Sequence, residues 1–143
     1  MSSPSTLSVV RAVFEAFDAH DLDRFRAFLA EDAILVVGAT GRTIRGAEAV
    51  VAAVAVTFRL IPDLRVTVTR AFASGAEGVA EVVREGTHTG DVPRPDGSTS
   101  PATGRAVRLP ECVVFDVREG RVARMTVWAD EADTARQLGL AEP

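Results

Sequence analysis

The chain has 143 residues and a formal net charge of −4; 47% of its residues are hydrophobic and 25% are charged. This length and balance predict one domain, residues 1–143, and the scattered arginines argue against nucleic acid as a partner. No apolar run reaches the ~20 residues of a membrane span, and the first residues lack the basic start and apolar segment of a signal peptide. Together with the single cysteine, Cys112, these features predict a cytoplasmic protein with no membrane partner.

The first sixty residues predict three helices and one short strand. In the first helix, apolar residues recur at three- and four-residue steps over residues 7–17. A second, short helix begins at Leu22 with Asp21 as its N-cap, and residues 33–37 form an apolar strand. After a turn-rich connection, the alanine- and valine-rich run 47–60 predicts a buried third helix.

The second half of the chain predicts antiparallel strands and a short C-terminal helix. The strands are expected at residues 64–73, 79–87, 107–117 and 122–130. An exposed loop or extended hairpin tip rich in Pro, Gly, Ser and Thr separates the middle two strands, and residues 131–140 form a short C-terminal helix or tail. Helices followed by strands indicate an α+β fold, with three N-terminal helices against one side of a curved antiparallel sheet around an apolar cavity.

The last two strands are joined by Glu119-Gly120, which suits a two-residue hairpin turn. A regular hairpin with this turn places Phe115 opposite Arg124, Val113 opposite Thr126, Glu111 opposite Trp128 and Leu109 opposite Asp130. Paired residues share a face of the sheet, and Glu111 is the one charged residue on an otherwise apolar face. This register therefore predicts two carboxylates, Glu111 and Asp130, at one end of an apolar interior.

Two neighbouring carboxylates in an apolar interior are a candidate acid/base site. Burial disfavours the charged form and raises the pKa of a carboxyl group, and a second carboxylate raises one of the pair further. Such a group can exchange protons near neutral pH. The alternative is structural: Glu111 pairs with an arginine, Arg84 or Arg124, or this end of the strand is exposed.

A histidine ends the strand expected at 79–87. The small residues of that strand share a face with Arg84 and His88, and small residues are expected where a ligand or another backbone comes close. The pattern places His88 at the mouth of the pocket. The alternative is a histidine that is hydrogen-bonded in a turn.

Missing residue types exclude several kinds of chemistry. The chain contains no lysine, no tyrosine and no asparagine, and all sixteen basic residues are arginine. The absence of lysine excludes Schiff-base catalysis, and the absence of tyrosine excludes a phenolic acid or oxyanion donor. The two histidines are far apart and no cysteine cluster accompanies them, so we expect no metal site.

Several motifs occur in an order that resembles a known family. The HDLDRF step after the first helix, then AEDA and GRTIRGAEAV, resemble the NTF2-like superfamily. GTHTG, PATGRAV, VVFDVREGRV and a WAD segment followed by QLG together resemble the SnoaL-like polyketide cyclases. The similarity covers nearly the whole chain.

The resemblance implies a cone-shaped α+β barrel with a deep apolar cavity. It also implies an enzyme without metal or cofactor that closes a ring of a polyketide intermediate by intramolecular aldol condensation. The family's catalytic aspartate stands seven positions before the glutamine of QLG. Asp130 and Gln137 match this spacing, so Asp130 inherits the acid/base role, and the resemblance also places His88 near the cavity.

The expected site combines catalytic and substrate-binding residues. The catalytic candidates are Asp130, Glu111 and His88. The substrate-binding candidates are Trp128, Arg84, Arg124, Thr126 and Phe14. We expect the partner to be a hydrophobic, polyketide-like small molecule. We also expect a homodimer or higher homo-oligomer, formed through an apolar convex sheet face with Cys112, Val114, Met125 and Val127.

Other functions share this architecture. A ketosteroid isomerase of the well-known type is excluded because it needs a tyrosine as oxyanion donor. An epoxide hydrolase of the limonene type uses a tyrosine and an asparagine, which this chain lacks, although an Asp130/Arg84/Glu111 variant is conceivable. A non-catalytic small-molecule-binding domain would show a filled interior, with Glu111 and Asp130 both held in salt bridges. Two departures from the family bear on substrate identity: DAILVVGA carries no histidine, and PRPDGSTS is an insertion.

Overall fold

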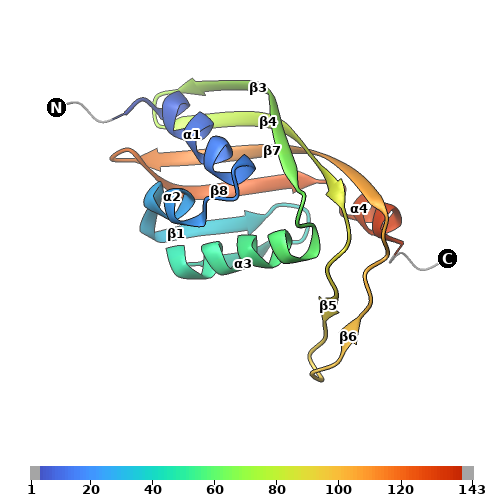
Figure 1. The fold of residues 1–143 in the computed structure, drawn as a ribbon. Coiled ribbons are helices and arrows are strands. Elements are labelled where there is room, and N and C mark those ends of the chain that lie inside the picture. Colours follow the sequence, from blue (N-terminus) through green and yellow to red (C-terminus); the bar gives the residue numbers. More distant parts are fainter. Residues whose placement is uncertain (1–3, 140–143) are drawn as a thin grey trace.

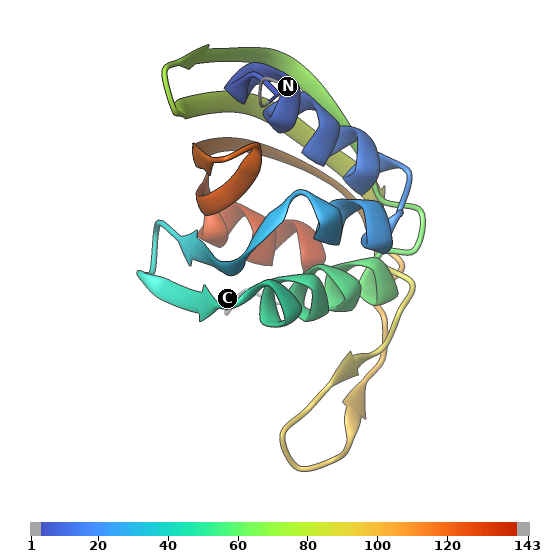
Figure 2. The same ribbon diagram turned by 90° about the vertical axis from the view of Figure 1, so that its left-hand side faces the viewer.

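The computed structural model describes residues 4–139, which form a curved six-stranded sheet with the three N-terminal helices on its concave side (Figures 1 and 2). The helices are α1 (Thr6–Asp18), α2 (Leu22–Ala27), α3 (Ala47–Leu60) and α4 (Glu131–Leu138). The strands of the sheet are β1 (Leu29–Val37), β2 (Arg42–Arg45), β3 (Arg65–Ser74), β4 (Glu77–Thr87), β7 (Ala106–Arg118) and β8 (Arg121–Ala129). A separate small hairpin consists of β5 (Val92–Pro93) and β6 (Thr99–Ser100). The predicted α+β class is confirmed.

The helix boundaries follow from caps that are visible in the sequence. The Ser5 side chain accepts a hydrogen bond at the start of α1, and Asp21 caps α2 as predicted. α4 ends at Gly139, whose φ of 73° is a left-handed conformation that favours glycine. The predicted C-terminal helix extends to Leu140, which lies outside the described residues. Within the described range, no helix is both long and apolar enough to cross a membrane.

The sheet has the order β2-β1-β8-β7-β4-β3, and its neighbouring strands are antiparallel except β1 and β8, which run parallel. The expectation of a fully antiparallel sheet is therefore wrong at this one pair. β1, the first strand in the chain, pairs with β8, the last one. Because the two strands are far apart in sequence, no local sequence pattern indicates that they pair or in which direction. β2 lies in the segment that was expected to be only a connection.

A β-bulge in the last hairpin changes which residues face the interior. The turn is the predicted one, but the pairing shifts by one residue between Asp116 and Val117. Beyond the shift, Glu111 lies opposite Ala129 and not opposite Trp128. The predicted register is wrong from this point on, because one extra residue in a strand moves every later side chain to the other face.

The bulge exchanges the two faces of β8. Met125 and Val127, expected on the convex face, line the interior. Arg124, Thr126 and Trp128 lie on the outer face, and Trp128 is 51% exposed. The expected apolar convex face therefore loses two of its members and keeps its β7 residues.

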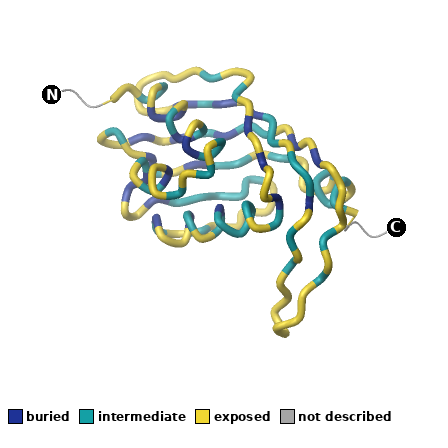
Figure 3. The backbone as a smooth tube through the Cα atoms, in the orientation of Figure 1, coloured by how far each residue is buried: buried dark blue, intermediate teal, exposed yellow. Residues whose placement is uncertain are grey.

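The main hydrophobic core lies between the N-terminal helices and the sheet (Figure 3). At its centre Phe115 is fully buried, and its ring meets that of Phe14 edge-on with the ring centroids 5.7 Å apart. A smaller cluster around Leu64 and Leu109 joins the segment after α3 to the first half of β7. These two clusters hold α1 and α3 against the sheet on either side of a cavity.

The β5–β6 hairpin extends from the body of the domain as an arm (Figure 1). It forms the tip of the loop that the sequence predicts from its Pro, Gly, Ser and Thr content. The Leu60 carbonyl accepts hydrogen bonds from the N–H groups of Thr89 and Gly90, which ties the arm to the end of α3. A side chain at Gly90 would collide with the Arg59 carbonyl, so this close approach requires glycine.

Replacing Phe115 by alanine should destabilise the fold strongly, because truncating a buried phenylalanine lowers the free energy of unfolding by about 3–5 kcal/mol. Urea denaturation followed by circular dichroism measures the loss. The matched control is Phe72→Ala: Phe72 is 48% exposed, and its truncation should change stability by about 0.5 kcal/mol or less. Equal effects of the two substitutions would contradict the assignment of Phe115 to the buried face.

Candidate active site

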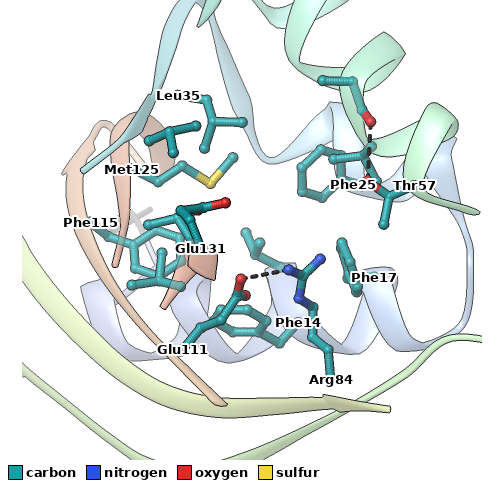
Figure 4. Close-up of a pocket in the computed structure, with 16 residues that line it drawn as sticks. Phe14, Phe17, Phe25, Leu35, Thr57, Arg84, Glu111, Phe115, Met125 and Glu131 are labelled. Carbon is teal, nitrogen blue, oxygen red and sulfur yellow. Dashed lines mark hydrogen bonds and ion pairs between the residues drawn. The ribbon is translucent and has the colours of Figure 1, made fainter. Parts of the chain in front are cut away.

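A cavity of about 210 Å³ opens between the helices and the concave face of the sheet (Figure 4). Its wall is mostly apolar, and phenylalanines from α1, α2 and β7 form much of it. The apolar lining residues include Phe14, Phe17, Phe25, Leu35, Phe115 and Met125. The predicted apolar pocket is therefore present in the fold.

Three ionisable side chains interrupt the apolar wall: Arg84 from β4, Glu111 from β7 and Glu131 from α4. Strand alternation explains the first two. Arg84 pairs with Leu109, two residues before Glu111 on β7, so Arg84 and Glu111 are diagonal neighbours on the same inward face. Among residues 4–139, no three acidic, histidine or cysteine side chains are placed to share a metal ion.

Arg84 and Glu111 form a largely buried ion pair. Nη2 of Arg84 donates a hydrogen bond to Oε2 of Glu111 over 2.5 Å, and the two side chains are 22% and 7% exposed. Nε of Arg84 is buried and has no hydrogen-bond partner in the described part of the chain. A buried N–H group without an acceptor is unfavourable, so this donor is available to an oxygen atom of a bound molecule.

Burial raises the pKa of the Glu111 carboxyl group above its ordinary value of 4.5. The charge and hydrogen bond of Arg84 oppose this shift, and the negative charge of Glu131 adds to it. Burial dominates because removing a carboxylate from water costs more than one cationic partner restores. Glu111 therefore holds its proton to a higher pH than an exposed glutamate does, which a general acid or base near neutral pH requires.

Asp130 lies outside this cavity. It is exposed, and its carboxylate accepts a hydrogen bond from the backbone N–H of Asp133 over 2.9 Å, which caps α4. Together with Glu111 and Trp128, Asp130 borders an open groove on the outer face. The sequence placed Asp130 with Glu111 in an apolar interior, whereas the structure places Asp130 at this groove and the next residue, Glu131, at the cavity (Figure 4).

His88 is buried, with 1% of its surface exposed, but it is not among the residues that line the cavity. Its Nδ1 accepts a hydrogen bond from the backbone N–H of Thr103 over 3.2 Å, and the Thr103 hydroxyl lies 2.9 Å from the same nitrogen. Backbone hydrogen bonds to Gly104 and Arg105 close the same junction. The geometry matches the structural alternative, since His88 joins the two chain segments at the base of the arm.

The structure brings two of the five predicted substrate-binding residues into the cavity. Phe14 and Arg84 line it. Arg124, Thr126 and Trp128 face outward because of the bulge. The Trp128 ring lies so close to Gly38 that a Cβ atom there would overlap it, which fixes the ring against the outer surface.

Reasoning from the sequence missed Glu131, Phe17 and Met125 as cavity residues. Phe17 carried a usable signal, because it follows Phe14 by three residues on the same face of α1. Met125 carried none, since its direction depends on the bulge. For Glu131, the family spacing drew attention to its neighbour, Asp130, instead.

Solved structures with the same architecture come from several organisms. A predicted SnoaL-like polyketide cyclase from Jannaschia sp. CCS1 is 22% identical and has a TM-score of 0.81 over 100% of both chains. A predicted polyketide cyclase from Xanthomonas campestris pv. campestris is 28% identical, with a TM-score of 0.76 over 93% of this chain and 96% of that one. An LEH-like epoxide hydrolase from M. tuberculosis is 20% identical, with a TM-score of 0.70 over 93% and 88%. No curated protein matches the chain.

These similarities show the fold alone, an α+β fold of the NTF2 or ketosteroid isomerase-like type. The model of the SnoaL-like polyketide cyclase family matches residues 7–138. The chain belongs to this family, and the resemblance inferred from the sequence motifs is confirmed.

The raised pKa of Glu111 predicts a pH-dependent change in stability. The folded state binds the Glu111 proton more tightly than the unfolded state, so this contribution is complete below pH 4.5 and is lost as the pH rises through the folded pKa. The free energy of unfolding of Glu111→Gln minus that of the wild type should therefore increase over this range and then level off. Urea titrations from about pH 4 to 8 measure it. A difference that falls with pH would mean that Arg84 outweighs burial.

Proposed function

We propose that this protein is a cofactor-independent enzyme that closes a ring in a polyketide-like substrate by aldol-type acid/base catalysis, with Glu111 as the proton-transfer group. The observation that carries the proposal is the Arg84–Glu111 pair in an apolar cavity, where the carboxyl pKa is raised and an arginine N–H is unused. Membership of the SnoaL-like polyketide cyclase family supports the reaction class.

An intramolecular aldol closure needs one proton removed and one returned. The Glu111 carboxylate takes a proton from a carbon next to a carbonyl group, and the C–H electrons form an enolate. The enolate carbon attacks a ketone of the same molecule, so a carbon–carbon bond forms while the ketone π bond becomes an alkoxide. Protonated Glu111 then returns its proton to the alkoxide, which balances the step and regenerates the carboxylate.

Arg84 supports this reaction in two ways. Its Nη2 holds the Glu111 carboxylate in one orientation, and its free Nε–H offers a donor to the developing enolate oxygen. A fixed donor in a water-poor site stabilises developing negative charge more than a solvent-exposed donor does. The apolar wall holds the two reacting carbon atoms close together.

The cavity volume favours a small reacting portion of the substrate. At about 210 Å³, the cavity lies below the ~300–1,000 Å³ of typical small-molecule sites and matches the volume of about seven water molecules. We therefore propose that one forming ring lies inside, against Phe14, Phe17 and Phe115, while the rest of the substrate extends toward the mouth.

Asp130 is the second candidate for proton transfer, because its spacing from Gln137 matches the family motif. Its carboxylate is exposed and engaged in capping α4, so it can meet a substrate only from the outer groove. His88 is proposed to act structurally at the base of the arm. The choice between Glu111 and Asp130 is open to direct test.

The grouping of Arg84 with two carboxylates supports epoxide hydrolysis as a second reaction class. Glu111 and Glu131 both border the cavity beside Arg84. In this scheme Glu131 takes a proton from water, the water oxygen attacks an epoxide carbon, and protonated Glu111 donates to the oxygen as the carbon–oxygen bond breaks. The non-catalytic alternative requires a filled interior, with Glu111 and Asp130 both held in salt bridges. It is less well supported, because the cavity is open and Asp130 forms no ion pair with the described residues.

Glu111→Gln should lower the rate of ring closure about 10²–10⁴-fold, because it removes the proton-transfer group, while an unreactive analogue should still bind. The assay follows the absorbance of the cyclised product of a 1,3-dicarbonyl chain with an internal ketone, and calorimetry measures analogue binding. Asp130→Asn is the comparison, since asparagine also caps helices; we expect it to lose less than about tenfold. The opposite ranking would transfer the role to Asp130, and full activity in both variants would refute both assignments.

We also propose that the outer sheet face pairs two copies of the chain. Cys112, Val114 and Trp128 lie there with partly or largely exposed side chains, and contiguous exposed apolar surface commonly marks an interaction site. Light scattering should give about twice the chain mass of 15.1 kDa, and Trp128→Glu should give a single chain. A wild-type mass equal to one chain would remove the proposal.

A further inference from the structure

The end of β8 leaves part of β7 without a neighbour. β8 stops at Ala129, opposite Glu111, so residues 106–110 of β7 have β4 on one side and no strand on the other. Backbone groups at such an edge need other partners. Gln137 of α4 supplies them: its Oε1 accepts from the Arg108 N–H over 2.7 Å, and its Nε2 donates to the Arg108 carbonyl over 2.8 Å.

The Gln137 carboxamide therefore takes the place of a peptide group of the missing strand. Its second Nε2 hydrogen is also engaged, since Nε2 lies 2.8 Å from Oδ2 of Asp133. Asp133 in turn donates its backbone N–H to the Asp130 cap. The side chain that docks α4 and the residue that starts it thus belong to one hydrogen-bonded network.

Little else holds α4 in place. The helix has no buried residue, and among its apolar side chains Leu138 is the one that packs against the smaller core cluster, partly buried. Figure 1 shows α4 beside the beginning of β7, where the chain returns from the arm to the sheet. Among the described residues, the two hydrogen bonds between Gln137 and Arg108 are the side-chain hydrogen bonds that join α4 to the sheet.

The position of α4 determines the position of Glu131, its first residue. Glu131 lines the cavity, and in Figure 4 its side chain points toward the space above Glu111. We propose that Gln137 is a positioning residue that docks α4 as a movable wall of the cavity and so sets Glu131 against Glu111. That Glu111 transfers protons rests on the proposed function; the docking itself does not.

The groups that face Glu111 make this docking measurable. In the cavity Arg84 faces it from β4 and Glu131 from α4, and the other cavity residues, on α1, α2, α3, β1, β7 and β8, carry no charge. On the outer side, Glu81 of β4 and Asp130 border the groove that Glu111 also lines. If α4 leaves its place, Glu111 loses a negative neighbour and gains water. Both changes lower the pKa of its carboxyl group.

The test uses the full-length protein without substrate. Gln137→Ala removes both hydrogen bonds to Arg108, and Gln137→Met removes them while keeping a side chain of similar length, in case alanine prevents folding. Glu131→Gln removes the negative charge and leaves the docking residue intact. Arg136→Ala is the control in the same helix: the exposed Arg136 has one ion pair, to Asp133 over 3.5 Å, and among the described residues it forms no hydrogen bond or ion pair with Arg108 and does not line the cavity.

Two measurements separate the docking of α4 on β7 from the effect of α4 on the Glu111 pKa. Amide hydrogen exchange at Arg108 reports whether the carboxamide is in place, and it should accelerate about tenfold or more in both Gln137 variants and stay unchanged in Arg136→Ala. Carbon-13 NMR of the glutamate carboxyl groups reports the Glu111 titration. The Glu111 pKa should fall in the Gln137 variants and in Glu131→Gln, and should match the wild type in Arg136→Ala.

Each contrary result is decisive. Unchanged Arg108 exchange in the Gln137 variants would refute the docking role. Faster exchange with an unchanged Glu111 titration would refute the link from α4 to the site. If the titration shifts as expected but Glu111→Gln still closes rings at the wild-type rate, the proposed function fails and the docking role of Gln137 stands.

Discussion

The burial of a carboxylate, Glu111, is the constraint on which the rest of this site depends. A charge removed from water loses several kcal/mol of solvation, and one cationic partner restores only part of it. Arg84 is that partner, and it gives up hydration as well, leaving one N–H without an acceptor. The pair is therefore incompletely satisfied in the free protein, and an oxygen of a bound molecule would complete it. A site built in this way combines a carboxyl group of raised pKa with an arginine N–H that can donate to a developing negative charge.

The wall around this pair is decided by a single irregularity in the sheet. Without the bulge near Asp116, Thr126 and Trp128 would point at Glu111, and the cavity would be more polar and narrower. With it, Met125 and Val127 face inward, so the wall is flexible and apolar. The desolvation of Glu111, which raises its pKa, thus depends on the one extra residue that the bulge inserts into β8.

The end of the sheet links the cavity to the C-terminal helix. Because β8 is shorter than β7, residues 106–110 of β7 have no neighbouring strand on that side, and Gln137 of α4 binds the backbone there. The N-cap of α4 separates two adjacent acids: Asp130 lies at the outer groove and accepts a hydrogen bond from the first turn, while Glu131, although exposed, borders the cavity. A spacing rule that selects one acid by its distance from Gln137 identifies the right segment, yet the cap geometry decides which carboxylate borders the cavity.

The sequence by itself determined the helices, the long strands, the α+β class, the family and the inward faces of β4 and β7, including Arg84 and Glu111, but it missed β2. These follow from caps such as Asp21 and from local periodicity, which act over a few residues. Only the tertiary structure decided that β1 joins β8 in parallel, that Trp128 lies outside, and that His88 joins the base of the arm while Glu131 reaches the cavity. Those outcomes depend on a bulge and on contacts between residues far apart in the chain. The alternation of apolar and polar residues within one strand does not predict a one-residue shift in its pairing with another strand.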